Sequence, residues 1–140
     1  MASKVPIKKI NPLIQAHNLR KLFPLSQIRV EKGVLSWIGD VVPSPLSRKY
    51  KVRLSYKLGD SPKIHVIDPV LHAPAGERLP HTYPGKRLCL YYPRAGEWRS
   101  DMLLSQTIVP WISEWLLHYE IWQATGIWCA GGIHPIVKED

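Results

Sequence analysis

The sequence contains two cysteines, one phenylalanine and no long hydrophobic run. Two cysteines cannot build a disulfide framework, and free thiols are stable in a reducing cytosol. No uninterrupted apolar stretch approaches the roughly 18–20 residues that a membrane span requires. The basic residues 1–9 are not followed by the apolar segment of a signal peptide. We therefore expect a cytoplasmic protein that does not enter a membrane.

Two glycine-rich nucleotide-binding patterns are also missing. The sequence contains neither Gly-x-Gly-x-x-Gly nor Gly-x4-Gly-Lys-Ser/Thr, the loops that bind dinucleotides and ATP. We therefore expect no nucleotide cofactor.

A zinc site is an alternative, because the sequence contains four residues of types that bind zinc: His81, Cys89, Cys129 and His134. Their spacings are His-x7-Cys and Cys-x4-His, whereas structural zinc sites usually contain a tight Cys-x2-4-Cys knuckle. We expect no metal, and we interpret Cys129 and His134 as structural residues of the tail, where Gly131-Gly132 predicts a turn.

The 140 residues are 45% hydrophobic, enough for one globular core, so we expect a single domain over residues 1–140. The 13 prolines are spread from Pro6 to Pro135. Because proline interrupts helices, this spread favours short elements joined by stiff loops over a helical bundle.

The formal net charge of +8 requires an interpretation. A basic surface binds nucleic acid, binds an acidic protein, or only keeps a protein soluble. The basic residues are distributed along the chain and form no block, and basic domains commonly bind other proteins. We therefore regard nucleic acid as the less favoured partner.

The order of predicted elements indicates an α+β fold. A helix is expected from Asn11, its cap, to about Leu22, and three strands are expected at residues 34–39, 50–56 and 63–68. In the second strand, Tyr50, Val52, Leu54 and Tyr56 alternate with Lys51, Arg53 and Ser55. Such alternation predicts a half-buried strand of an antiparallel meander with a basic outer face.

The second half of the chain predicts a long loop, a short strand and a long helix. Residues 69–85 have no apolar period, and residues 88–92 have the composition of a strand. Thr107 is the expected cap of a helix that Gly126 ends. The aromatic stripe of this helix predicts core packing on the sheet.

Cys89 is the candidate nucleophile, because it stands where a loop of turn-forming residues enters an apolar run. A thiol at such a junction is expected to be reachable, and the cations Lys86 and Arg87 beside it would lower its pKa. His81 is the candidate base, although only a structure can give its distance from the thiol.

These residues resemble the catalytic core of ubiquitin-conjugating enzymes, in which a His-Pro-Asn motif precedes the active cysteine and a tryptophan follows it. By this resemblance His81 is the motif histidine, which orders the loop, Cys89 is the thioester cysteine and Trp98 is the tryptophan. Within this family, the chain more closely resembles the bacterial members of type II CBASS, the cyclic-oligonucleotide antiphage systems. That similarity lies in Gln15-Ala16-His17-Asn18-Leu19-Arg20, Leu88-Cys89-Leu90-Tyr91 and the tryptophan-rich helix.

The resemblance implies a ubiquitin-conjugating-enzyme-like fold, with an N-terminal helix, an antiparallel β-meander, an active-site loop and a long C-terminal helix. The chain departs from the family where His81-Thr82-Tyr83 replaces the motif with its asparagine, and the gap to Cys89 is short. The hydroxyl of Thr82 or Tyr83, or backbone amides near Gly85, would have to steady the oxyanion.

The implied activity is acyl transfer. Cys89 would accept, as a thioester, the C-terminus of a partner cGAS/DncV-like nucleotidyltransferase and pass it to a target lysine, which primes antiphage signalling. The 140 residues leave no room for the activating domain found in two-domain relatives, so a separate activating enzyme acts or none is needed. The alternative is a non-catalytic module that binds the nucleotidyltransferase or nucleic acid through its basic face.

Overall fold

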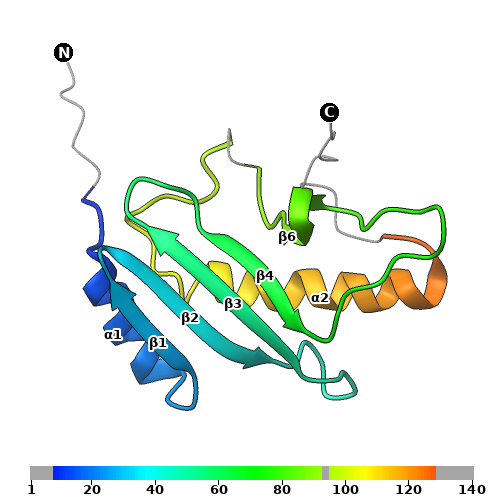
Figure 1. The fold of residues 1–140 in the computed structure, drawn as a ribbon, viewed down its shortest axis with the longest axis horizontal. Coiled ribbons are helices and arrows are strands. Elements are labelled where there is room, and N and C mark those ends of the chain that lie inside the picture. The colour runs from blue at the N-terminus through cyan, green and yellow to red at the C-terminus, as the bar shows by residue number, and fades with distance from the viewer. Residues whose placement is uncertain (1–7, 93–94, 129–140) are drawn as a thin grey trace.

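The computed structural model describes residues 8–92 and 95–128, which form an α+β fold (Figure 1). The elements are, in order, α1 (Pro12–Leu22), β1 (Gln27–Glu31), β2 (Val34–Val41), β3 (Tyr50–Lys57), β4 (Lys63–Asp68), β5 (Thr82–Tyr83), the 3-10 turn η1 (Pro84–Lys86), β6 (Arg87–Leu88) and α2 (Ile108–Thr125). No helix within the described ranges has the length and apolarity needed to cross a membrane.

Helix α1 begins as the sequence predicts. The Asn11 side chain accepts a hydrogen bond from the Leu13 amide at 2.8 Å, and Pro12 occupies the first turn, where its missing N–H is harmless. The helix buries Gln15, Ala16 and Leu19. The apolar side chains of Leu13, Ile14 and Leu22 are exposed. The spacing of apolar residues in this segment therefore identifies only some of its core residues.

Strand β1 was not predicted from the sequence. It pairs with β2 through a tight turn at Lys32 and Gly33, which both have positive φ values, 51° and 77°. Two successive positive φ values are typical of the type I′ turn that matches the twist of a hairpin. The signal was present in Ile28 and Val30, which alternate with polar residues and face the core.

The four strands form an antiparallel meander in the order β1-β2-β3-β4. In β3, the alternating residues Tyr50, Val52, Leu54 and Tyr56 are buried, which confirms the prediction from their spacing. Lys51 and Arg53 are exposed on the opposite side. We call this opposite side, from which the polar residues of β1–β4 project, the outer face.

Both helices cover the inner face of the sheet, and the face turned toward the viewer in Figure 1 has no helix over it. The core between the sheet and the helices contains Ala16 and Leu19 from α1, Leu35 and Trp37 from β2, and the buried stripe of α2. The buried members of that stripe are Ile108, Val109, Ile112, Trp115, Leu116, Tyr119 and Trp122. The predicted core role of the aromatic helix is therefore confirmed.

The ends of α2 differ in how well the sequence predicts them. Gly126 ends the helix with φ 77°, as predicted. Thr107 precedes the helix, but its side chain does not cap it. The Thr107 hydroxyl donates to the Leu103 carbonyl at 2.9 Å and accepts from the indole of Trp98 at 3.1 Å, so it stabilises the preceding loop instead.

Candidate active site

Cys89 is the first residue after a small hairpin. Strands β5 and β6 pair Thr82 with Leu88 and Tyr83 with Arg87, and η1 connects them. The Cys89 amide then donates to the His81 carbonyl at 2.9 Å, which extends the pairing by one step. The predicted strand over residues 88–92 is therefore wrong in extent, because β6 ends at Leu88.

His81 connects the hairpin to α2. Its carbonyl accepts hydrogen bonds from the Cys89 amide at 2.9 Å and from the indole of Trp115 at 3.0 Å. Its ring packs against the ring of Trp128, with 5.1 Å between the centroids. The two hydrogen bonds to its carbonyl hold the backbone next to Cys89 in place.

The thiol of Cys89 is buried, with 4% of the residue exposed, whereas the sequence led us to expect a reachable thiol. Sγ lies 3.6 Å from the hydroxyl of Tyr83 and donates to the Tyr91 carbonyl at 3.5 Å. The difference arises because the pairing of β6 with β5 directs the chain into the core, where Leu88, Leu90 and Tyr91 are also buried.

Burial raises the pKa of the Cys89 thiol, while the hydrogen bond with Tyr83, the Tyr91 backbone and the charge of Arg87 lower it by less. The expected cationic activation is therefore outweighed. Arg87 lies over the ring of Tyr83, 4.2 Å from its centroid. Lys86 instead donates to the Leu71 carbonyl at 3.1 Å, which connects η1 to the loop after β4.

Tyr83, Thr82 and the backbone near Gly85 are the candidate substitutes for the missing asparagine, and the structure places them differently. The hydroxyl of Tyr83 contacts Sγ, and burial together with the hydrogen bond to Cys89 raises its pKa to about 12, so it keeps its proton at neutral pH. The hydroxyl of Thr82 donates to the Leu79 carbonyl at 2.9 Å. Gly85 lies in η1 with φ 79°, a conformation that glycine adopts without strain.

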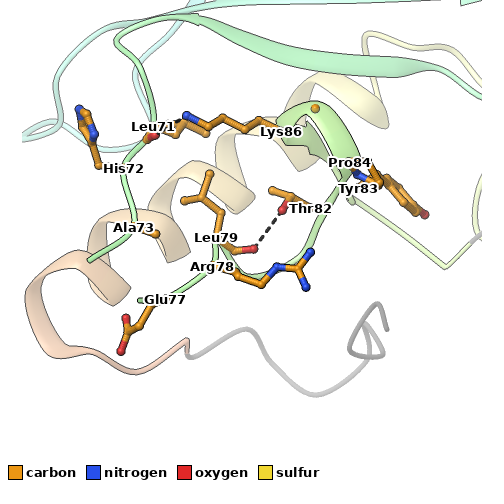
Figure 2. A pocket seen from close by; sticks show the side chains of 11 residues that line it. Leu71, His72, Ala73, Glu77, Arg78, Leu79, Thr82, Tyr83, Pro84 and Lys86 are labelled. Carbon is orange, nitrogen blue, oxygen red and sulfur yellow. Dashed lines mark hydrogen bonds between the residues drawn. The ribbon is translucent and has the colours of Figure 1, made fainter. Parts of the chain in front are cut away.

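Two hollows flank Tyr83. The larger, about 490 Å³, is a groove between η1 and the loop after β4, with Leu71, Leu79 and Lys86 in its wall (Figure 2). Figure 2 shows the Tyr83 ring turned away from this groove. The smaller, about 170 Å³, is lined by Tyr83, Arg87 and Tyr91 among others.

The loop after β4 is held by α2, which the sequence did not predict. The His72 amide donates to the Tyr119 hydroxyl at 2.9 Å, and the His72 carbonyl accepts from Gln123 at 2.5 Å. A segment rich in proline and without an apolar period thus forms a fixed wall of the groove. Its anchors lie 47 and 51 residues away in the sequence, a distance over which local patterns carry no information.

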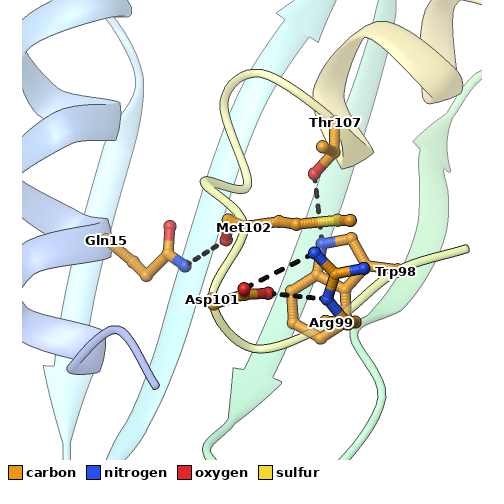
Figure 3. A network of polar contacts seen from close by, with 6 residues as sticks. All are labelled: Gln15, Trp98, Arg99, Asp101, Met102 and Thr107. Carbon is orange, nitrogen blue, oxygen red and sulfur yellow. Dashed lines mark hydrogen bonds and ion pairs between the residues drawn. The ribbon is translucent and has the colours of Figure 1, made fainter. Parts of the chain in front are cut away.

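Trp98 stabilises the loop that leads into α2. Its indole donates to Thr107, and its ring meets the edge of Tyr56 with 5.4 Å between centroids. Figure 3 shows the same loop joined to α1 by Gln15, whose side chain donates to the Met102 carbonyl at 2.8 Å. The Gln15 side chain also accepts from the Leu104 amide at 2.9 Å. Trp98 therefore stabilises the loop before α2 and is not among the described contacts of Sγ.

The proposed zinc ligands are only partly described. Cys129 and His134 lie outside the described residues. Within residues 8–92 and 95–128, no group of three or more histidine, cysteine or acidic side chains is arranged to hold a metal ion.

Comparison with known protein families finds a match over most of the chain. The family model described as type II CBASS E2 protein matches residues 15–135, which include most of α1, the whole sheet, the β5–β6 hairpin with Cys89, and α2. No curated protein matches the chain.

Proposed function

The chain belongs to the type II CBASS E2 family, and on that premise we propose that it is a ubiquitin-conjugating-enzyme-like transferase with Cys89 as nucleophile. We further propose that residues 1–140 form a single domain of the ubiquitin-conjugating-enzyme-like fold. The helix, meander, hairpin and helix of the described residues support this assignment.

The reaction proceeds in two acyl transfers. The Cys89 thiolate attacks the activated C-terminal carbonyl of the donor, the activating group leaves, and a thioester forms. The amine of a target lysine then attacks the thioester carbonyl, an amide bond forms, and the thiolate leaves as the amine loses its proton to solvent. The donor is the C-terminus of the nucleotidyltransferase of the same CBASS system, and a separate activating enzyme attaches the activating group that leaves in the first transfer.

The observation that carries this proposal is the position of the Cys89 sulfur. Sγ lies 3.6 Å from a phenol that keeps its proton, at the end of a hairpin fixed through His81. A hydroxyl in this position donates a hydrogen bond to the thiolate, and it lies close to where a developing oxyanion forms. Tyr83 thus takes the role that the missing asparagine leaves open.

The buried thiol adds a requirement to this mechanism. Because burial raises the pKa of Cys89, the resting site holds the neutral thiol at physiological pH. The sulfur must therefore become accessible before attack without losing its contact with the Tyr83 hydroxyl, and Arg87 is the cation placed to favour the thiolate then.

Intact mass spectrometry of the chain co-expressed with its neighbouring nucleotidyltransferase tests the proposal. We expect a partner-sized adduct in the wild type that disappears with thiol reductant and is absent from Cys89→Ala. Cys129→Ala is the matched control, because it removes the other cysteine and should keep the adduct. An adduct that persists in Cys89→Ala would contradict the assignment of the nucleophile.

The burial of Cys89 favours a second candidate function, a non-catalytic module that binds the nucleotidyltransferase through the basic outer face. In that case Cys89→Ala would have no effect in the co-expression experiment. Charge reversal at the exposed Lys51 and Arg53 would instead abolish a non-covalent complex.

A further inference from the structure

The outer face of the sheet carries cations next to the hairpin that holds Cys89. Arg53 in β3 is the cross-strand partner of His65 in β4, and two residues further along the sheet Ser55 is the partner of Lys63. Arg53 and Lys63 are exposed. Since partners two residues apart along a strand project from the same side of the sheet, these side chains share one face.

Arg87 in β6 extends this group of cations toward the thiol. Burial lowers the pKa of His65 first, and the charges of Arg53, Arg87 and Lys63 lower it further, so all three cations act on this imidazole. We call Arg53, Lys63 and Arg87 the basic row. The row runs from the middle of the outer face, across β4, to the β5–β6 hairpin.

Among the residues that the structure describes, no carboxylate forms an ion pair with the basic row. Within residues 8–92 and 95–128, ion pairs join Arg29 to Glu31 and Arg99 to Asp101, and none involves a member of the basic row. Unpaired cations of this kind attract an acidic partner and orient its approach.

The basic row also borders an approach to the reacting sulfur. Arg87 lines the 170 Å³ hollow together with Ser61, Tyr83 and Tyr91. Tyr83 and Tyr91 are the residues that contact Sγ. Lys63 follows Ser61 by two positions at the start of β4, and its sequence neighbours Pro62 and Ile64 also line the hollow.

We propose that the basic row binds an acidic segment of the donor protein that immediately precedes the donor's C-terminal carboxyl. This inference rests on the proposed function and names the feature by which the donor is recognised. The donor is the occupant because its C-terminus must reach Sγ. An extended chain advances about 3.3 Å per residue, so the residues before the carboxyl extend out of the hollow, whose wall includes Arg87 of the row.

Fluorescence anisotropy with two short labelled peptides tests this inference. Both end in a free carboxylate, and one carries glutamates in the positions before its C-terminus where the other carries glutamines. We expect the acidic peptide to bind about tenfold more tightly at low salt, with the difference lost in about 0.5 M salt. Arg53→Glu combined with Lys63→Glu should remove the preference. Lys49→Glu is the control, because it reverses an exposed charge outside the row and the hollow.

Several results would overturn the inference. Equal binding of the two peptides, no binding of either, or a preference that survives the double charge reversal would each exclude the row as the recognition surface. Tighter binding of a single-stranded oligonucleotide, with the peptide displaced, would assign the row to nucleic acid. Cys89→Ala should bind the acidic peptide as the wild type does, so a failure of the thioester chemistry remains distinguishable from a failure of donor recognition.

Discussion

The four-stranded sheet and the β5–β6 hairpin are both antiparallel, but different contacts stabilise them. The sheet is stabilised by its buried face, because every second residue of β3 packs into the core beneath the sheet. The hairpin pairs two residues with two, too few to be stable alone, and is held by contacts from elsewhere. Trp115 binds the His81 carbonyl, and Lys86 binds the Leu71 carbonyl. The sheet is thus stabilised by the side chains of its own strands packing into the core, whereas the hairpin depends on hydrogen bonds with α2 and with the loop after β4.

The largest expected effect is loss of stability from the sheet. Leu54 is fully buried in β3, so Leu54→Ala removes its core contacts and leaves a cavity. We expect the free energy of unfolding to fall by about 2–5 kcal/mol, measured by urea denaturation. Lys51→Ala, on the exposed side of the same strand, should change it by less than about 0.5 kcal/mol. Equal effects of the two substitutions would contradict the assignment of faces.

A smaller effect is expected where α2 supports the hairpin. Trp115→Phe keeps an aromatic ring but removes the N–H that donates to the His81 carbonyl. We expect the free energy of opening the hairpin to fall by about 1 kcal/mol. The Cys89 amide should therefore exchange with deuterium about fivefold faster.

Trp122→Phe is the control for ring size, because Trp122 is buried in the same helix and makes no described hydrogen bond to the hairpin. If both variants accelerate exchange of the Cys89 amide equally, then packing rather than the hydrogen bond to His81 holds the hairpin.

The same contrast explains what the sequence could predict. The Asn11 cap, the buried face of β3 and the end of α2 at Gly126 follow from local chemistry, and all three are confirmed. Strand β1 has an equally local signal in the alternation of Ile28 and Val30 with polar residues. The burial of Cys89 could not be predicted, because Trp115, which fixes its neighbour His81, lies 34 residues away from that residue in sequence.

The site residues divide in the same way. Cys89, His81 and Tyr83 stand within nine positions of one another, so their proximity was implicit in the sequence. Thr82, Gly85 and Lys86 are equally near, yet Thr82 and Lys86 bind backbone carbonyls of the loop after β4 rather than the thiol. Sequence spacing identifies which residues lie near the nucleophile, and only the three-dimensional contacts separate the residue that contacts sulfur from those that hold the loop.

The smallest expected effect is on the acidity of the thiol. The hydrogen bond of Tyr83 lowers the pKa of Cys89, so Tyr83→Phe, which keeps the ring beneath Arg87, should raise it further. The thiolate fraction at a given alkaline pH then falls. We expect iodoacetamide to alkylate Cys89 about two- to threefold more slowly at pH 8, corresponding to a net hydrogen-bond contribution of about 0.5 kcal/mol.

The pH profile of this alkylation separates acidity from access. A raised pKa moves the rise in rate to higher pH and leaves the plateau at high pH unchanged, whereas a loosened cover raises the rate at every pH. Tyr91→Phe is the control, because the Sγ contact of Tyr91 is made by its backbone carbonyl, which this substitution retains. A Tyr83→Phe profile that coincides with the wild type, or moves to lower pH, would remove Tyr83 from the mechanism and leave Arg87 as the group that favours the thiolate.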